Sequence, residues 1–287
     1  MHVSMTVPTD DLQQARTVYR DLEELGYDRA FSFEAKHDPF IPLAVAAEHT
    51  EHIALGTAIA IAFARTPMTL ANVAWDLQTV TGGRFVLGLG SQIQPHVEQR
   101  FSMPWGDPIA RMEELVQGIR AIWQAWETGE RLAFRGEHYT HTRMIPAFSP
   151  GPNPFGLPPI FTAGFGPKMT EVAGRVADGF LVHPVNTRRS LLELTLPALE
   201  RGAIASGRTL ADLEVVCVTI VVTGRTEEEL ARSREAVREQ LAFYGPTPAY
   251  QPVFELHGYG DLHPELQALA RQDRWQDMAA LIPDDLI

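Results

Sequence analysis

The sequence predicts a parallel α/β barrel of the (β/α)8 type, a TIM barrel. Short apolar segments typical of strands alternate with amphipathic segments typical of helices along most of the 287 residues. Residues 53–61 are apolar on both faces, which indicates a strand of a parallel sheet that is covered on both sides. No strand segment has the character of a sheet edge, so a closed barrel is favoured over an open doubly wound sheet.

The first part of the chain contains four predicted strands and the helices between them. A helix with Asp10 or Asp11 as its cap follows the first strand and ends at Gly26. Thr66 and Pro67 begin a later helix, which the glycines after residue 81 interrupt. The predicted strands cover 2–7, 29–33, 53–61 and 84–90, and the predicted helices cover 12–25, 43–51 and 67–81.

The second part begins with an insertion, residues 91–157, inside what we expect to be a single domain over 1–287. Within it we expect a polar loop over 91–106, an amphipathic helix from Asp107 and a hairpin over 129–144. Strands are then predicted at 159–162, 180–183 and 214–223, with helices from Pro167, over 187–206 and from Thr226. Thr226 and Glu229 have the spacing of a capping box. No eighth strand is evident, so we expect further residues of the complete gene product to supply it.

Composition excludes several classes of partner. A formal net charge of −12 argues against nucleic acid and against an anionic membrane surface. No apolar run is long enough for a membrane span and no signal peptide precedes the first strand, so we expect a cytoplasmic protein. The single cysteine, Cys217, cannot form a disulfide within the chain, and its apolar surroundings predict a small buried side chain.

A glycine loop marks the strongest candidate for an anion site. Gly164, Phe165 and Gly166 follow a predicted strand, and Pro167 begins a helix, whose first N–H groups and dipole favour negative charge. Lys168 adds a positive charge at the same place. The alternative is a tight turn that binds no ligand.

The other predicted strand ends carry few acid or base groups. In a barrel of this type the chemistry lies at the carboxyl ends of the strands. Neither a Ser/His/Asp order nor the spacing of metal ligands is present, so we expect no metal. A mostly apolar lining with one anion site suits a flat organic cofactor that bears a phosphate. The residues at these ends are Thr9, Glu34, His37, Ala58, Ile59, Ser91, Gln92 and His183.

Three motifs together resemble the bacterial luciferase-like superfamily of flavin and deazaflavin oxidoreductases, over residues 3–223. They are GTAIAIAFARTP, GGRFVLGLGSQ and AGFGPKMTEVAGRVADGF, in this order. The chain is most similar to the branch that uses the deazaflavin coenzyme F-420. The resemblance implies that the loop from Gly164 to Met169 holds the cofactor phosphate. It also implies a cis peptide bond between Ala58 and Ile59, which backs the cofactor ring, and contacts from Ser91 and Gln92 to ring or substrate.

One position departs from the family pattern. Members that oxidise sugars and alcohols carry an Asp-His pair after the second strand, whereas this chain has Glu34 and Ala35. We expect Glu34 to hydrogen-bond the ring and to face the barrel mouth. His37 could replace the missing base or be a loop residue bonded to backbone, and His183 is either a pocket donor or a strand-end histidine with its own partners. His96 is expected to be exposed.

The sequence therefore predicts an oxidoreductase that transfers hydride between coenzyme F-420 and a small organic substrate. The absence of the Asp-His pair favours reduction of an activated double bond over alcohol oxidation. The alternatives are an FMN-dependent monooxygenase of the same superfamily and a non-catalytic barrel that binds flavin or phosphate. A homodimer is expected, from family habit and from aromatic residues in 112–126 that we expect to be exposed.

Overall fold

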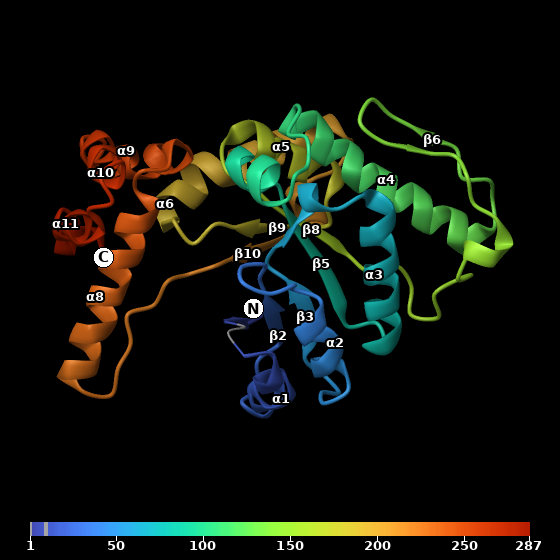
Figure 1. The fold of residues 1–287 in the computed structure, drawn as a ribbon, viewed down its shortest axis with the longest axis horizontal. Coiled ribbons are helices and arrows are strands. Elements are labelled where there is room, and N and C mark those ends of the chain that lie inside the picture. The colour runs from blue at the N-terminus through green and yellow to red at the C-terminus, as the bar shows by residue number, and fades with distance from the viewer. Residues whose placement is uncertain (1, 9–10) are drawn as a thin grey trace. The chain divides into compact units, whose positions relative to one another are not determined.

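A computed structural model describes residues 2–8 and 11–287 of the chain, and Figure 1 shows their path. The chain forms two compact units. Unit 1 comprises Met1–Gly164, Lys168–Leu181 and Leu199–Val215, and unit 2 comprises Phe165–Pro167, Val182–Ala198 and Val216–Ile287. That all 287 residues form one domain stays a prediction.

The central sheet has eight strands, and every pair whose register is defined in it is parallel. Their order is β1-β2-β3-β5-β8-β9-β10, with the short β4 paired to β5. The parallel α/β class is therefore confirmed. The strands are β1 (Ser4–Val7), β2 (Arg29–Ser32), β3 (Ala54–Thr57), β4 (Ala60–Ile61), β5 (Phe85–Gly90), β8 (Ile160–Ala163), β9 (Gly179–Val182) and β10 (Glu214–Cys217).

An ion pair shows that this sheet is strongly curled. β2 and β10 lie far apart in the strand order, yet Arg29 of β2 binds Glu214 of β10 through both oxygens, with 2.9 Å between Nη2 and Oε2. The Arg29 guanidinium also lies 5.8 Å from the ring centre of Phe161 in β8. Among the described residues no strand joins β10 to β1, as the lack of a predicted eighth strand anticipates.

The helices begin and end largely where the sequence predicts. Thr66 caps α3 by accepting from the Thr69 N–H, and Asp107 caps α4 by accepting from the Ile109 and Ala110 N–H groups. The helices are α1 (Ala15–Glu24), α2 (Ile41–Ala47), α3 (Pro67–Val80), α4 (Pro108–Thr128), α5 (Pro167–Val176), α6 (Arg188–Ser190), α7 (Leu196–Ala205), α8 (Glu227–Tyr244), α9 (Gln251–Leu256), α10 (Leu262–Ala270) and α11 (Trp275–Ala280). The predicted hairpin forms as the antiparallel pair β6 (Phe134–Arg135) and β7 (Thr140–His141).

Helix caps show two smaller differences from the sequence expectations. The side chain of Asp11 accepts from the Gln13 N–H, whereas Asp10 and Thr9 lie outside the described residues. Thr226 caps α8 as predicted, but the Glu229 carboxylate accepts from the Arg225 N–H instead of completing the box at Thr226. The reciprocal half of the predicted capping box is thus displaced by one residue.

Two expectations about burial are wrong. Met112, Trp123 and Trp126 of α4 are buried in the core of unit 1, because α4 packs this face against α3 and the hairpin. The exposure argument for a homodimer therefore has no basis. Cys217 is exposed, because it ends β10, which is the last strand in the sheet order. This strand also ends earlier than the predicted 214–223.

The third predicted strand is interrupted, and a side chain fills the gap. β3 pairs with β5 as far as Gly56, and β4 resumes the pairing at Ala60. Between them the Thr57 hydroxyl donates to the Gly88 carbonyl, with 2.7 Å between oxygens, and accepts from the Gly88 N–H at 2.9 Å. A Cβ at Gly88 would lie 1.7 Å from the Thr57 carbonyl oxygen, so only glycine fits. The backbone of Gly88 has no partner strand on this side, and the Thr57 hydroxyl makes both of its hydrogen bonds instead.

None of the helices in the described part of the chain combines the length and the apolar content needed to cross a membrane.

The Thr57 bridge leads to a first prediction. Thr57→Val keeps the shape of the side chain but leaves the buried N–H and C=O of Gly88 unpaired, so we expect the free energy of unfolding to fall by about 2–4 kcal/mol. Thr57→Ser restores the hydroxyl and should lose much less. Urea unfolding of the three proteins checks this, and an equal loss in the serine and valine variants would contradict the bridge.

Candidate functional site

The carboxyl ends of β2, β3, β4 and β5 meet at one edge of the sheet in unit 1. The chain turns from β3 into β4 through Ala58 and Ile59, and the peptide bond between them is cis, as predicted. The Ala58 N–H donates to the Ser32 carbonyl at 2.7 Å, and the Ile59 carbonyl accepts from the Glu34 N–H at 3.0 Å. Ala58 and Ile59 are paired with no residue of β5, and we call these two residues the bulge. The structure places Glu34 beside it.

The end of β5 completes this edge. Ile61 pairs with Gly90, and a Cβ at Gly90 would lie 2.9 Å from the Ile59 side chain, so glycine leaves room for that side chain. Ser91 and Gln92 follow directly and are half-buried. The Ser91 hydroxyl donates to the Gln92 carbonyl at 3.0 Å, and Gln92 has a left-handed backbone with φ of 62°. Both predicted residues thus lie next to the bulge.

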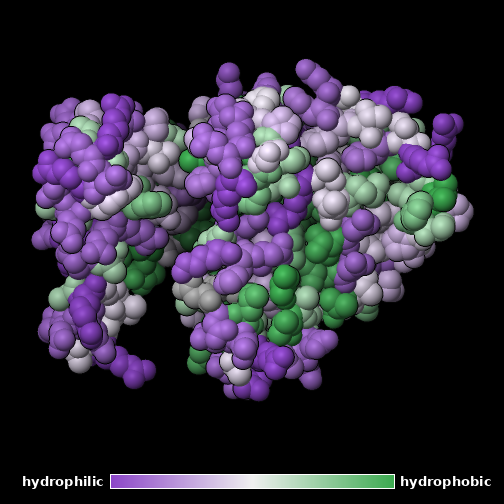
Figure 2. Space-filling model, viewed as in Figure 1, coloured by the Kyte–Doolittle hydropathy of each residue, from purple (hydrophilic) through white to green (hydrophobic). Residues whose placement is uncertain are grey.

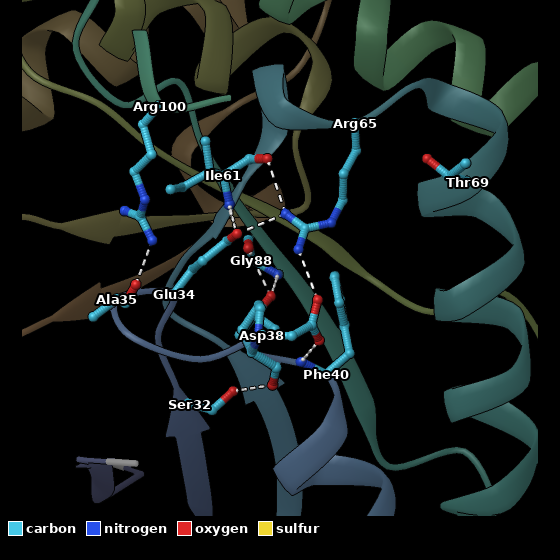
Figure 3. A network of polar contacts seen from close by, with 12 residues as sticks. Ser32, Glu34, Ala35, Asp38, Phe40, Ile61, Arg65, Thr69, Gly88 and Arg100 are labelled. Carbon is cyan, nitrogen blue, oxygen red and sulfur yellow. Dashed lines mark hydrogen bonds and ion pairs between the residues drawn. The ribbon is translucent and has the colours of Figure 1, made fainter. Parts of the chain in front are cut away.

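Glu34 is held by a network of polar contacts, which Figure 3 shows. Its Oε2 accepts from the Ile61 N–H at 2.7 Å and from Nη1 of Arg65 at 2.6 Å. Only 6% of the Glu34 side chain is exposed, so it does not turn outward into bulk solvent. A buried carboxylate needs such partners because an unpaired charge away from water is costly.

Arg65 and Asp38 are functional candidates that sequence reasoning missed. Nη2 of Arg65 donates to Oδ2 of Asp38 at 2.8 Å, so the guanidinium lies between two carboxylates. Burial lowers the pKa of Arg65, but hydrogen bonds and charges from Glu34 and Asp38 outweigh it and raise this pKa. The available signal was a single charged residue within the apolar run IAFARTP.

Two other histidines lie outside this network. His37 is half-buried in the turn after β2, and no side chain of the described residues forms a hydrogen bond with its ring. His96 begins a short helical turn, His96–Arg100, inside the segment 91–106 that was predicted as a loop, and it is exposed as expected. Arg100 from the same loop donates to the Ala35 carbonyl, so this loop is tied to the end of β2.

The glycine loop before α5 contains one exposed glycine and one glycine packed against a side chain. Gly166 is exposed and has a φ of +82°, with nothing within 4 Å of a Cβ built there. A Cβ at Gly164 would lie 2.2 Å from Cγ of Met169, whose side chain is buried. Pro167 begins α5 and Lys168 is exposed beside it. Because its side chain is buried, Met169 can meet a ligand only through its backbone. The exposed Lys168 can meet one with its charged side chain.

His183, in unit 2, has its own partners. Nδ1 accepts from the Val185 N–H at 3.1 Å, so the proton of the neutral ring lies on Nε2, 3.0 Å from the Tyr250 hydroxyl. The rings of His183 and Tyr250 stack with centres 4.4 Å apart, and Phe165 meets Tyr250 edge-on at 4.8 Å. Burial lowers the pKa of His183 to about 4. Sequence reasoning missed Tyr250 because it lies 67 residues after His183 in the chain.

A groove of about 760 Å³ lies between α2 and α3 of unit 1. Apolar side chains form most of its wall, and Figure 2 shows a hydrophobic patch over this region. Arg65 and Asp38 line it as well, so the polar network at the end of β2 extends to this groove. In the described part of the chain, no three His, Cys, Asp or Glu side chains are placed to hold a metal ion.

The buried His183 predicts an acid-dependent loss of stability. In the unfolded chain this histidine binds a proton near pH 6.5, whereas in the folded chain it does so only near pH 4. Stability is therefore lost as pH falls from about 6.5 to about 4, by about 2 kcal/mol at pH 4.5.

His183→Phe keeps the stacking and cannot be protonated, so its free energy of unfolding should fall less between pH 7 and 4.5. His52→Gln is the control, since the His52 side chain is 86% exposed and should leave the pH dependence unchanged. Urea unfolding at the two pH values measures this, and identical acid losses in wild type and His183→Phe would refute it.

Comparison with known proteins places this geometry in a family. The family model described as luciferase-like monooxygenase matches residues 1–287. An uncharacterized protein of Mycobacterium tuberculosis is 53% identical over 266 residues, which cover 93% of this chain and 78% of that protein. An F-420-dependent glucose-6-phosphate dehydrogenase of Beutenbergia cavernae is 34% identical over 200 residues, covering 68% and 56%.

A solved structure has the same fold. The coenzyme F-420-dependent tetrahydromethanopterin reductase of Methanopyrus kandleri aligns with a TM-score of 0.77 and 19% sequence identity. The alignment covers 100% of this chain and 83% of that one. The chain belongs to the luciferase-like monooxygenase family.

Proposed function

We propose that this chain is an oxidoreductase that transfers hydride between coenzyme F-420 and a small organic substrate. The observation that carries the proposal is the strand-end edge of unit 1. There the Ala58–Ile59 bulge, the half-buried Ser91 and Gln92 and the fixed carboxylate of Glu34 lie together. The named F-420-dependent relatives support the choice of cofactor.

The residues present fit such a cofactor. No described residue donates to the second oxygen of Glu34, which leaves an acceptor for a ring or substrate hydrogen. Gly164 and Gly166 add no side chain of their own at the start of α5, where a phosphate is favoured. The deazaflavin supplies the hydride carrier when bound. The protein's residues bind and orient the cofactor and the substrate.

We propose a separate role for each group. The backbone of Ala58 and Ile59 backs one face of the ring, and Ser91 and Gln92 contact ring or substrate. The backbone of the glycine loop, with the charge of Lys168, binds the phosphate. His37 and His183 are the remaining candidates for contact with substrate. Because Ala35 replaces the histidine base of the alcohol-oxidising pattern, we propose reduction of an activated double bond.

The second candidate is an FMN-dependent monooxygenase, which the description of the matching family favours. A non-catalytic flavin-binding or phosphate-binding barrel is the alternative of another class. We also keep the homodimer and the cytoplasmic location as proposals, both of which rest on sequence and resemblance.

Calorimetric titration of the purified protein with each cofactor tests the proposed function. We expect coenzyme F-420 to bind at least about tenfold more tightly than FMN, a difference of about 1.4 kcal/mol. The reverse order would favour the monooxygenase. Binding without hydride exchange from the reduced cofactor to any acceptor would favour the non-catalytic alternative, and binding of neither cofactor would sink the proposal.

The glycine loop is tested by a pair of matched substitutions. Gly166 and Gly26 both have a positive φ, +82° and +84°, and open space at the Cβ position. Gly166→Asn and Gly26→Asn should therefore cost similar stability, about 1 kcal/mol. Only Gly166→Asn should weaken binding of the phosphorylated cofactor, by about tenfold or more, because its side chain blocks the approach to the N–H groups of α5.

The dephosphorylated cofactor is the second arm of this experiment. Its affinity for both variants should equal its affinity for the wild type, because it makes no phosphate contact that Gly166→Asn could block. Unchanged affinity of a folded Gly166→Asn protein for the intact cofactor would place the phosphate elsewhere.

A further inference from the structure

We propose that Arg65 is a positioning residue, which fixes the Glu34 carboxylate as a hydrogen-bond acceptor for the bound ligand. The inference deepens the proposed function and rests on it for the identity of the ligand. It concerns a residue that the sequence motifs contain but do not single out.

The first step is the geometry of the Glu34 carboxylate. Two donors, the Ile61 N–H and Nη1 of Arg65, converge on the same oxygen, Oε2, at 2.7 Å and 2.6 Å. Neither donor can turn into an acceptor, so both of them need Oε2 as their hydrogen-bond acceptor. Arginine in particular stays charged and can only donate. Oε2 is therefore committed, and Oε1 is the atom that remains for a ligand.

The second step is the fixation of Arg65 itself. Its other terminal nitrogen binds Oδ2 of Asp38 at 2.8 Å, and its guanidinium lies 5.3 Å from the ring centre of Phe40. Asp38 is held in turn, because its Oδ1 accepts from the Phe40 N–H at 2.8 Å. The planar fork of arginine spans both carboxylates at once, as Figure 3 shows. Arg65 can therefore neither slide away from Glu34 nor rotate without breaking the second pair.

The third step is the link to the bulge. Nη1 of Arg65 also lies 3.3 Å from the carbonyl oxygen of Ile61, whose N–H binds Glu34. Glu34 thus accepts from the N–H of Ile61 and Arg65 donates to its carbonyl, so the two side chains hold both backbone groups of a residue that lies two positions after the bulge. A change at Arg65 alters where the carboxylate points relative to the Ala58–Ile59 backbone, which is the surface proposed to back the ring.

A purely structural ion pair is the competing explanation, and a double-mutant cycle separates the two. If Arg65 acts through Glu34, Arg65→Met should weaken coenzyme F-420 binding about tenfold or more in the wild type. It should have no further effect in a Glu34→Gln background. Arg65→Lys keeps the charge but cannot span both carboxylates, so it should restore part of the affinity.

Arg84→Met is the matched control. Arg84 is also a partly buried arginine and donates to the Ile53 and Thr50 carbonyls, at the opposite ends of the strands. It should lower the melting temperature without changing the affinity. Unchanged affinity in Arg65→Met, or an equal loss in the wild-type and Glu34→Gln backgrounds, would overturn the positioning role.

A measurement without cofactor keeps the two proposals distinguishable. The ¹³C carboxyl signal of Glu34, assigned with Glu34→Gln, should shift in ligand-free Arg65→Met and stay unchanged in Arg84→Met. An unmoved Glu34 signal in Arg65→Met would refute the inference even if the cofactor binds. If the wild type binds neither F-420 nor FMN, the proposed function fails, and the signal still decides whether Arg65 positions Glu34.

Discussion

The Thr57 hydroxyl is the constraint on which the strand-end edge depends. It satisfies both backbone groups of Gly88 at the point where the pairing of β3 with β5 stops. With those groups satisfied, Ala58 and Ile59 are free to leave the ladder and bind the end of β2 instead. Ile61 then returns to β5 and offers its N–H to Glu34. The contacts of Glu34 with the backbone of Ile59 and Ile61 follow from that one interruption.

Apolar pattern and helix caps predict the fold well, because both are local properties of the chain. The caps at Thr66 and Asp107 and the parallel apolar strands follow from residues within one element. The interruption of the third strand does not, because residues 53–61 are equally apolar on both sides of it. The same pattern cannot distinguish a core position from a sheet edge, which explains the wrong expectation for Cys217.

The candidate site was predictable in part for the same reason. Glu34, the bulge, Ser91 and Gln92 follow strands directly, so their place at the sheet edge follows from strand order and from the resemblance. Arg65 and Tyr250 were not found, since their partners lie 31 and 67 residues away. The position of His183 at a strand end was predicted from the sequence. Its lowered pKa was not, because it depends on burial that only the folded structure supplies.

The groove between α2 and α3 has a consequence for ligand binding. Asp38 and Arg65 line this groove, Asp38 binds Arg65, and Arg65 also holds Glu34, so the groove and the strand ends share the arginine. If Arg65 positions Glu34 for a ligand as proposed, anything that filled the groove and displaced Arg65 would change the affinity at the strand ends. By thermodynamic linkage, a ligand at the strand ends would change the affinity of the groove by the same factor. Under that proposal, the shared arginine makes ligand binding in the groove energetically dependent on ligand binding at the strand-end edge of unit 1.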